Sequence, residues 1–268
     1  MTTSSHPRTA TPNGTVRRHY RMGPGNTAEA GPALEGAEAA AWGERARIVL
    51  TPVAAPSILG LYGFFAATLL VGSHMAGWWG TASAPTLVFP FVVMLGGIAQ
   101  FASGLWAYRA RDGLATAMHG IWGAFWLAFG LYQLLVATGA MPAVGSPKDM
   151  AFGFWFIPLC AITAAGTLAA AAVSLGFVAV LAPLAAGSFF AALGWMAGLS
   201  WSLSVAGWLF VFSAGFAWYT ASAMMLEGSF GRTILPTGQW SVAANVPGRT
   251  PSEPIEYEHG MPGARAGQ

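Results

Sequence analysis

Charged side chains are scarce in this sequence. Only 8% of its 268 residues are Asp, Glu, Lys or Arg, whereas a soluble globular domain has roughly 25%. No charge occurs in three long runs, 48–108, 113–147 and 150–226. A membrane-spanning helix needs about 20 apolar residues, so these runs accommodate about two, one and three such helices. The scarcity of charge therefore predicts an all-α polytopic membrane protein with six transmembrane helices, and the lipid bilayer as a partner.

Other absences narrow the function. The net charge of +2 is too small to attract a polyanion, which argues against a nucleic-acid partner, and the single Cys160 forms no internal disulfide. The sequence has no Walker or Rossmann glycine motif, no metal-spaced His and Cys cluster, and no carboxylate pair inside the spans. Without such groups we expect no metal, no cofactor and no enzymatic activity. Transport fits this composition better than covalent chemistry.

The domain organisation follows from the apolar runs. Residues 1–50 are expected to be a flexible cytoplasmic tail with a short interfacial helix at 37–50, residues 51–228 the six-helix domain, and residues 229–268 a cytoplasmic carboxy-terminal tail. The spans are expected at 53–75, 86–107, 114–138, 151–173, 177–197 and 204–226.

Arginine placement predicts the orientation. With six spans, every arginine lies on the side that holds both termini, and the opposite side has only Lys148. Because positive charge is retained on the cytoplasmic side, both termini are expected to be cytoplasmic, with the protein in the inner (cytoplasmic) membrane.

Small and weakly polar residues recur at helical spacing within the spans and could line a path. Gln100 carries an amide near mid-membrane, which serves either as a clasp between helices or as a ligand in a pore. Tyr219 lies on a comparable stripe of the last span, and His74 and His119 are the ionisable residues inside the spans. For any single small or hydroxyl residue, close helix packing is the alternative interpretation.

Three motifs resemble those of the acetate/succinate transporter family. They are Gly96-Gly97-Ile98-Ala99-Gln100, Trp122-Gly123-Ala124-Phe125-Trp126, and Phe230-Gly231-Arg232-Thr233-Ile234-Leu235-Pro236-Thr237-Gly238. The chain is identified as a divergent member, because Ala55, Ile58, Ala107, Trp122 and Arg111-Asp112-Gly113 replace residues that are usual in the family. A glutamate is usual at Ala107 and a tyrosine at Trp122, so the departures concern proton coupling and substrate affinity.

The resemblance implies a homohexamer of six-helix protomers, each with a path for small monocarboxylates such as acetate, and for succinate in some members. It implies a constriction at Phe64 and Trp122, with Leu184 placed third by counting back from Gly207-Trp208. Transport would then proceed through an anion channel or a proton-linked transporter. A larger ring without an O–H at Trp122 predicts slower anion passage or a preference for the neutral acid.

Both histidines have two interpretations under this resemblance. His74 either makes acid entry depend on pH or anchors the interface beside Trp78 and Trp79. His119 either attracts carboxylate or is a neutral imidazole bonded to a carbonyl. Two other functions stay open as alternatives: a channel for a small neutral solute such as urea or ammonia, and a sensor that has lost transport.

Overall fold

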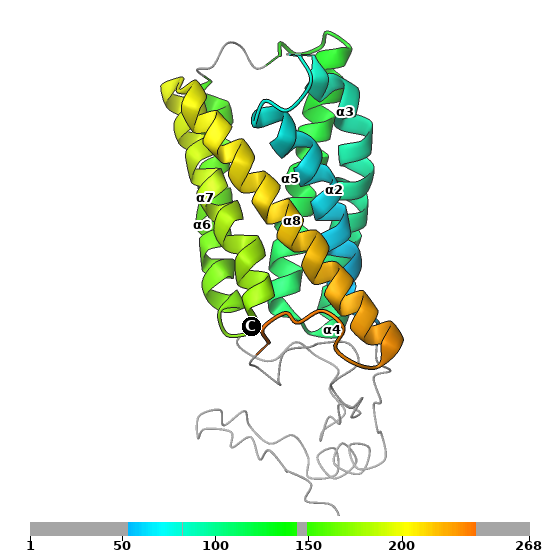
Figure 1. Cartoon of the computed structure of the whole chain (residues 1–268). Coiled ribbons are helices and arrows are strands. Elements are labelled where there is room, and N and C mark those ends of the chain that lie inside the picture. The colour runs from blue at the N-terminus through cyan, green and yellow to red at the C-terminus, as the bar shows by residue number, and fades with distance from the viewer. Residues whose placement is uncertain (1–52, 82, 144–148, 240–268) are drawn as a thin grey trace, which may run out of the picture. The chain divides into compact units, whose positions relative to one another are not determined.

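The computed structural model describes residues 53–81, 83–143 and 149–239, all within the unit Leu50–Pro254. Within these residues, six apolar segments are long enough to span a bilayer and pack as a helical bundle (Figure 1). They are α2 (Pro56–Met75), the segment Ala84–Ala110, α5 (Gly113–Ala137), α6 (Met150–Ala170), α7 (Leu175–Ala197) and α8 (Ser200–Phe230). The predicted fold class and number of spans are confirmed. The expected tail 1–50 with its helix at 37–50, most of the carboxy-terminal tail, and Lys148 lie outside the described residues.

The second span is not a uniform α-helix. It consists of α3 (Ala84–Val92), the π-helical segment η1 (Val93–Ala99) and α4 (Gln100–Ala110). Pro90 lies inside α3, where it lacks the N–H that a regular turn would use. Opposite η1, a Cβ added to Gly63 of α2 would lie within 2.4 Å of the Leu95 carbonyl oxygen. Glycine at this position therefore lets α2 approach the widened turn, which the sequence did not predict.

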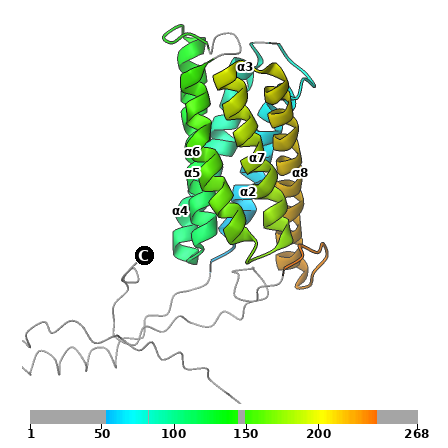
Figure 2. The same cartoon turned by 90° about the vertical axis from the view of Figure 1, so that its left-hand side faces the viewer.

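Helix α8 runs diagonally across the bundle and packs against both α2 and α7, while α7 also packs against α6 (Figures 1 and 2). It covers Ser200–Phe230, several residues more at each end than the expected span. Helix α7 corresponds to the expected span 177–197, and it begins two residues earlier. The Ser174 hydroxyl accepts a hydrogen bond from the Phe177 N–H at its start, and Gly198 ends it with φ of 72°.

The bundle has two ends, which we name by residues near them. The arginine end holds the turn between α4 and α5, with Arg109 and Arg111, and also the start of α7 and the end of α8; the His74 end holds the opposite turns. At the arginine end Arg111 closes α4 with φ of 57°, a left-handed conformation that glycine adopts more easily. Arg111 therefore holds a backbone conformation that a glycine would adopt with less strain.

Asp112 caps α5, and its substitution gives a prediction for stability. Its side chain accepts a hydrogen bond from the Ala115 N–H (2.9 Å), and burial raises the pKa of this carboxyl above its ordinary value. A raised folded-state pKa contributes stability that is complete below the unfolded pKa of about 4 and is lost as pH rises through the folded pKa. Asp112→Asn keeps the cap but has no titrating group. Its apparent melting temperature in detergent should therefore increase relative to that of the wild type as pH rises. Asp112→Ala should cost about 1 kcal/mol, and parallel pH curves for wild type and Asp112→Asn would contradict the role of ionisation.

Large apolar side chains cover the outside of the bundle. Leu87, Phe91 and Leu168 are 74%, 61% and 78% exposed, while small residues such as Ala67, Ala107 and Ala214 are fully buried. This distribution places bulky apolar groups toward the surroundings and small groups between helices, as a lipid environment favours. Together with the six apolar helices, it describes a multi-pass membrane protein.

Candidate functional site

Two cavities lie inside the bundle. The larger, of about 420 Å³, is at the His74 end, where His74, Met75, Thr86, Gln133 and Trp195 are among its lining residues. The smaller, of about 30 Å³, is toward the arginine end. Its lining includes Leu61, Phe64, Gln100, Leu114, Met118, His119, Phe177 and Leu181. The side chains of Trp122 and Leu184 line both cavities, so they mark the boundary between them.

Three helices running in the same direction bring the boundary residues to one level. Phe64 lies eight residues after Pro56 at the start of α2, Trp122 nine after Gly113 of α5, and Leu184 nine after Leu175 of α7. At 1.5 Å per residue, each is about 12–14 Å above the first residue of its helix. Residues closer to the arginine end on these helices line the small cavity, and residues beyond them line the large one. The three side chains predicted to form a constriction thus lie between two cavities.

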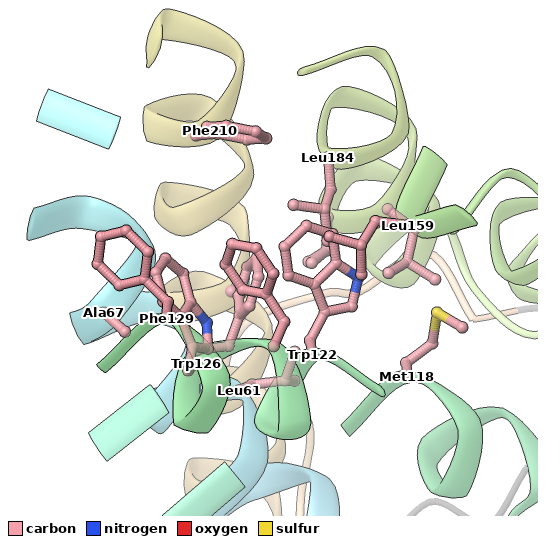
Figure 3. Packing of buried hydrophobic residues seen from close by; sticks show 14 of the residues in the cluster. Leu61, Ala67, Met118, Trp122, Trp126, Phe129, Leu159, Leu184 and Phe210 are labelled. Carbon is pink, nitrogen blue, oxygen red and sulfur yellow. The ribbon is translucent and has the colours of Figure 1, made fainter. Parts of the chain in front are cut away.

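These boundary side chains are closely packed. Phe64 and Trp122 meet edge to face with ring centroids 6.2 Å apart, and Phe64, Trp122 and Leu184 are 2%, 2% and 1% exposed. Figure 3 shows Trp122 of α5 beside Leu184 of α7. The indole Nε1–H of Trp122 donates a hydrogen bond of 3.0 Å to the Thr163 hydroxyl of α6. The boundary between the two cavities is therefore closed in this conformation, and it presents apolar side chains to a solute.

Several buried polar atoms near the cavities have no hydrogen-bond partner among the described residues. They are Thr68 Oγ1, Trp126 Nε1 and Trp195 Nε1 on residues lining the large cavity, and Gln100 Oε1 and His119 Nδ1 on residues lining the small one. Thr220 Oγ1 is the exception, on a residue that lines neither. An unpaired buried polar group costs about 1–3 kcal/mol. These unpaired atoms are concentrated on residues that line the cavities, where a passing polar solute or water molecule can provide the missing hydrogen bond.

The polar residues predicted for the path lie in different places. His74 lines the large cavity, with its Nδ1 3.0 Å from the Trp79 carbonyl oxygen. Gln100 and His119 both line the small cavity. Tyr219 lines neither, and its hydroxyl donates to the Pro236 carbonyl oxygen (2.9 Å). Three of the four residues thus line a cavity, whereas Tyr219 forms a hydrogen bond with the carboxy-terminal segment.

No charged side chain other than histidine is found among the described lining residues of either cavity. Ala107, where the family usually has glutamate, is fully buried on the face of α4 that also carries Gln100 and Ser103. The Ser103 hydroxyl on this face donates to the Pro56 carbonyl of α2. This face of α4 therefore packs against α2, and its Gln100 also lines the small cavity.

Sequence patterns did not identify Trp195 as part of the large cavity, or Thr163 as the hydrogen-bond partner of Trp122. Trp126 and Trp195 line the large cavity, and Thr163 holds Trp122. Thr68 of α2 also lines the large cavity. Helical spacing carries no information about the partner that Thr163 finds on another helix.

The carboxy-terminal motif has a structural role at the arginine end. Residues 231–239 turn back along the start of α7, where the Gly176 N–H donates to the Thr237 carbonyl (2.8 Å) and the Leu175 N–H to the Gly238 carbonyl (3.2 Å). Gly231 and Gly238 adopt φ of 65° and 63°, which explains glycine at both positions. The segment supplies acceptors to two of the free N–H groups at the amino end of α7.

Six membrane-length helices around two cavities separated by apolar side chains define a membrane protein of the transporter and channel class. The chain belongs to the GPR1/FUN34/yaaH family, whose model matches residues 43–239. The resemblance seen in the sequence motifs is thereby confirmed.

Named relatives agree with this class. The chain is 30% identical over 196 residues to the succinate-acetate/proton symporter SatP of Escherichia coli K12, covering 70% of this chain and 97% of that protein. It is 28% identical to an uncharacterised protein of Methanothermobacter thermautotrophicus, covering 71% and 94%. The structure of the bacterial acetate channel SatP matches with a TM-score of 0.64 and 26% identity, over 70% of this chain and all of that one. The two SatP relatives are named as a symporter and a channel, which are transport proteins rather than enzymes.

Proposed function

We propose that this protein moves small monocarboxylates, such as acetate, across a membrane through the two cavities and past Phe64, Trp122 and Leu184. The observation that carries the proposal is the arrangement of two cavities on either side of these three side chains. An apolar boundary between two cavities suits passage, because tight binding would slow release. The names of its relatives, an acetate channel and a succinate-acetate symporter, support the same substrate class.

Passage without obligatory proton coupling fits the site better than symport. The described lining of both cavities contains no carboxylate, and Ala107 stands buried where a glutamate is usual in the family. Uptake of radiolabelled acetate, succinate and urea into proteoliposomes, with and without a proton gradient, tests the proposal. Acetate uptake that needs no gradient supports it. Urea uptake alone would favour a neutral-solute channel, and absence of any uptake would favour a sensor.

The histidines give a prediction for pH dependence. His74 and His119 are the ionisable side chains among the described residues that line the cavities. We expect the double variant His74→Ala/His119→Ala to change the dependence of acetate uptake on pH, once uptake is normalised to the anion concentration, because it removes both ionisable side chains from the described lining. The two single variants show how much of the change in pH dependence comes from each histidine. A double variant with the wild-type profile would remove both histidines from the path.

Orientation and assembly belong to the same proposal. The arginine end is proposed to face the cytoplasm, which places both termini there in an inner-membrane protein. Cysteines introduced at Ala140 and Gly113, at opposite ends, should then react selectively with impermeant reagents from the outside and the inside of cells. We propose a homohexamer, each protomer with its own path, and a detergent-corrected mass from light scattering tests it. A monomeric mass in mild detergent would oppose it.

A further inference from the structure

The single polar atom among the three boundary side chains is already hydrogen-bonded. Phe64 and Leu184 have no polar side-chain atom, and Trp122 has one, the indole Nε1–H, which donates to the Thr163 hydroxyl at 3.0 Å. Thr163 is fully buried on α6 and lines neither described cavity. The hydrogen bond therefore directs the only donor at this level toward a residue outside the path.

Two other tryptophans of the large cavity provide a contrast. The indole N–H groups of Trp126 and Trp195 are buried without a partner among the described residues. Two indole donors on residues that line the large cavity are thus unoccupied, whereas the Trp122 donor at the boundary is occupied. An anion that moves from the large cavity to the boundary therefore leaves the residues with unoccupied indole N–H groups.

We propose that Thr163 is a positioning residue that determines charge selectivity, by keeping the Trp122 N–H from the path so that an anion meets an apolar level. This inference rests on the proposed function and adds to it a basis for selectivity between charged and neutral solutes. An anion loses hydration at such a level without compensation, and a neutral molecule of the same size loses far less. The Trp122–Thr163 pair thereby disfavours the carboxylate relative to a neutral isostere.

Thr163→Val tests the inference because it keeps the shape and removes the acceptor. The readouts are acetate current across a planar bilayer and acetamide uptake into proteoliposomes, which compare an anion with a neutral molecule of similar size. The freed N–H can donate to the passing carboxylate, so the ratio of acetate current to acetamide uptake should rise about tenfold, as expected for a hydrogen bond to a charged group. Thr163→Ser keeps the hydroxyl and should restore the wild-type ratio.

Two controls separate this effect from general loosening of α6. Thr167 lies one turn away, and its hydroxyl donates to the Thr163 carbonyl oxygen (2.8 Å) rather than to Trp122. Thr167→Val should leave the ratio unchanged. In a Trp122→Phe background, which has no indole N–H, Thr163→Val should also have no effect on the ratio. If the valine variant is not recovered from the membrane, Thr163→Ala removes the same acceptor.

The outcomes distinguish the inference from the proposed function. Equal increases of acetate and acetamide flux in Thr163→Val, an unchanged ratio, or an effect that persists without the Trp122 indole would overturn the role of Thr163. Absence of acetate uptake into proteoliposomes by the wild-type protein would overturn the proposed function itself. A raised ratio that serine reverses and that requires Trp122 supports the inference.

Discussion

Trp122→Tyr should increase the acetate current by about tenfold or more. The side chain lines both cavities, so it lies at the boundary between them, and the smaller phenol ring leaves more room there. Its hydroxyl also adds a donor that can accompany a carboxylate, and a hydrogen bond to a charged group is worth about 1.5–3 kcal/mol. Current measured across planar bilayers at fixed protein density gives the comparison.

Trp122→Phe is the matched control for ring size. It widens the boundary without adding a donor, so its acetate current should lie between those of the wild type and Trp122→Tyr. Equal currents for the phenylalanine and tyrosine variants would assign the effect to size alone. If neither variant differed from the wild type in current or pH dependence, the boundary would not limit flux.

Gly104→Ala should prevent the recovery of folded protein. A Cβ at Gly104 of α4 would lie 2.6 Å from the Gly120 backbone nitrogen of α5, too close for any contact. Because backbone cannot rotate away as a side chain can, the two helices must separate, at a cost of about 3 kcal/mol. Loss of the monodisperse peak in size-exclusion chromatography, or a large fall in apparent melting temperature, would show the effect.

Gly120→Ala offers a control on the facing helix. A Cβ at Gly120 meets nothing within 4 Å, and alanine favours a helix over glycine by about 0.5–1 kcal/mol. This variant should be recovered with an unchanged or raised melting temperature. Similar losses in both variants would mean that helix contact at this level does not depend on Gly104.

The fold was largely predictable because hydrophobicity and charge act locally along the chain. The absence of charge from 150 to 226 required three helices, and Ser174 and Gly198 marked the limits of α7 because a cap and a left-handed residue are local features. The π-helical turn of η1 was not predictable in the same way. It depends on the approach of α2 at Gly63, which lies 30 residues earlier than the start of η1.

The candidate site was predictable only in part. Family motifs and spacing selected Phe64, Trp122 and Leu184, which the fold brings to one level. Spacing also placed Tyr219 on an interior stripe, but α8 is covered on that side by the segment containing Pro236, so its hydroxyl binds there instead. Periodicity specifies a face of a helix, whereas a function depends on what another helix or loop presents to that face.

The π-helical turn of η1 also bears on how the chain length of this span can vary. A π turn holds about one residue more than an α turn, and one residue corresponds to a rotation of about 100° in a regular α-helix. Loss of one residue elsewhere in the span would turn Gln100, Ser103 and Ala107 away from α2, whereas loss within Val93–Ala99 can be absorbed by regular winding. Deletion of one residue from this span is therefore expected to be tolerated best where the winding is already irregular.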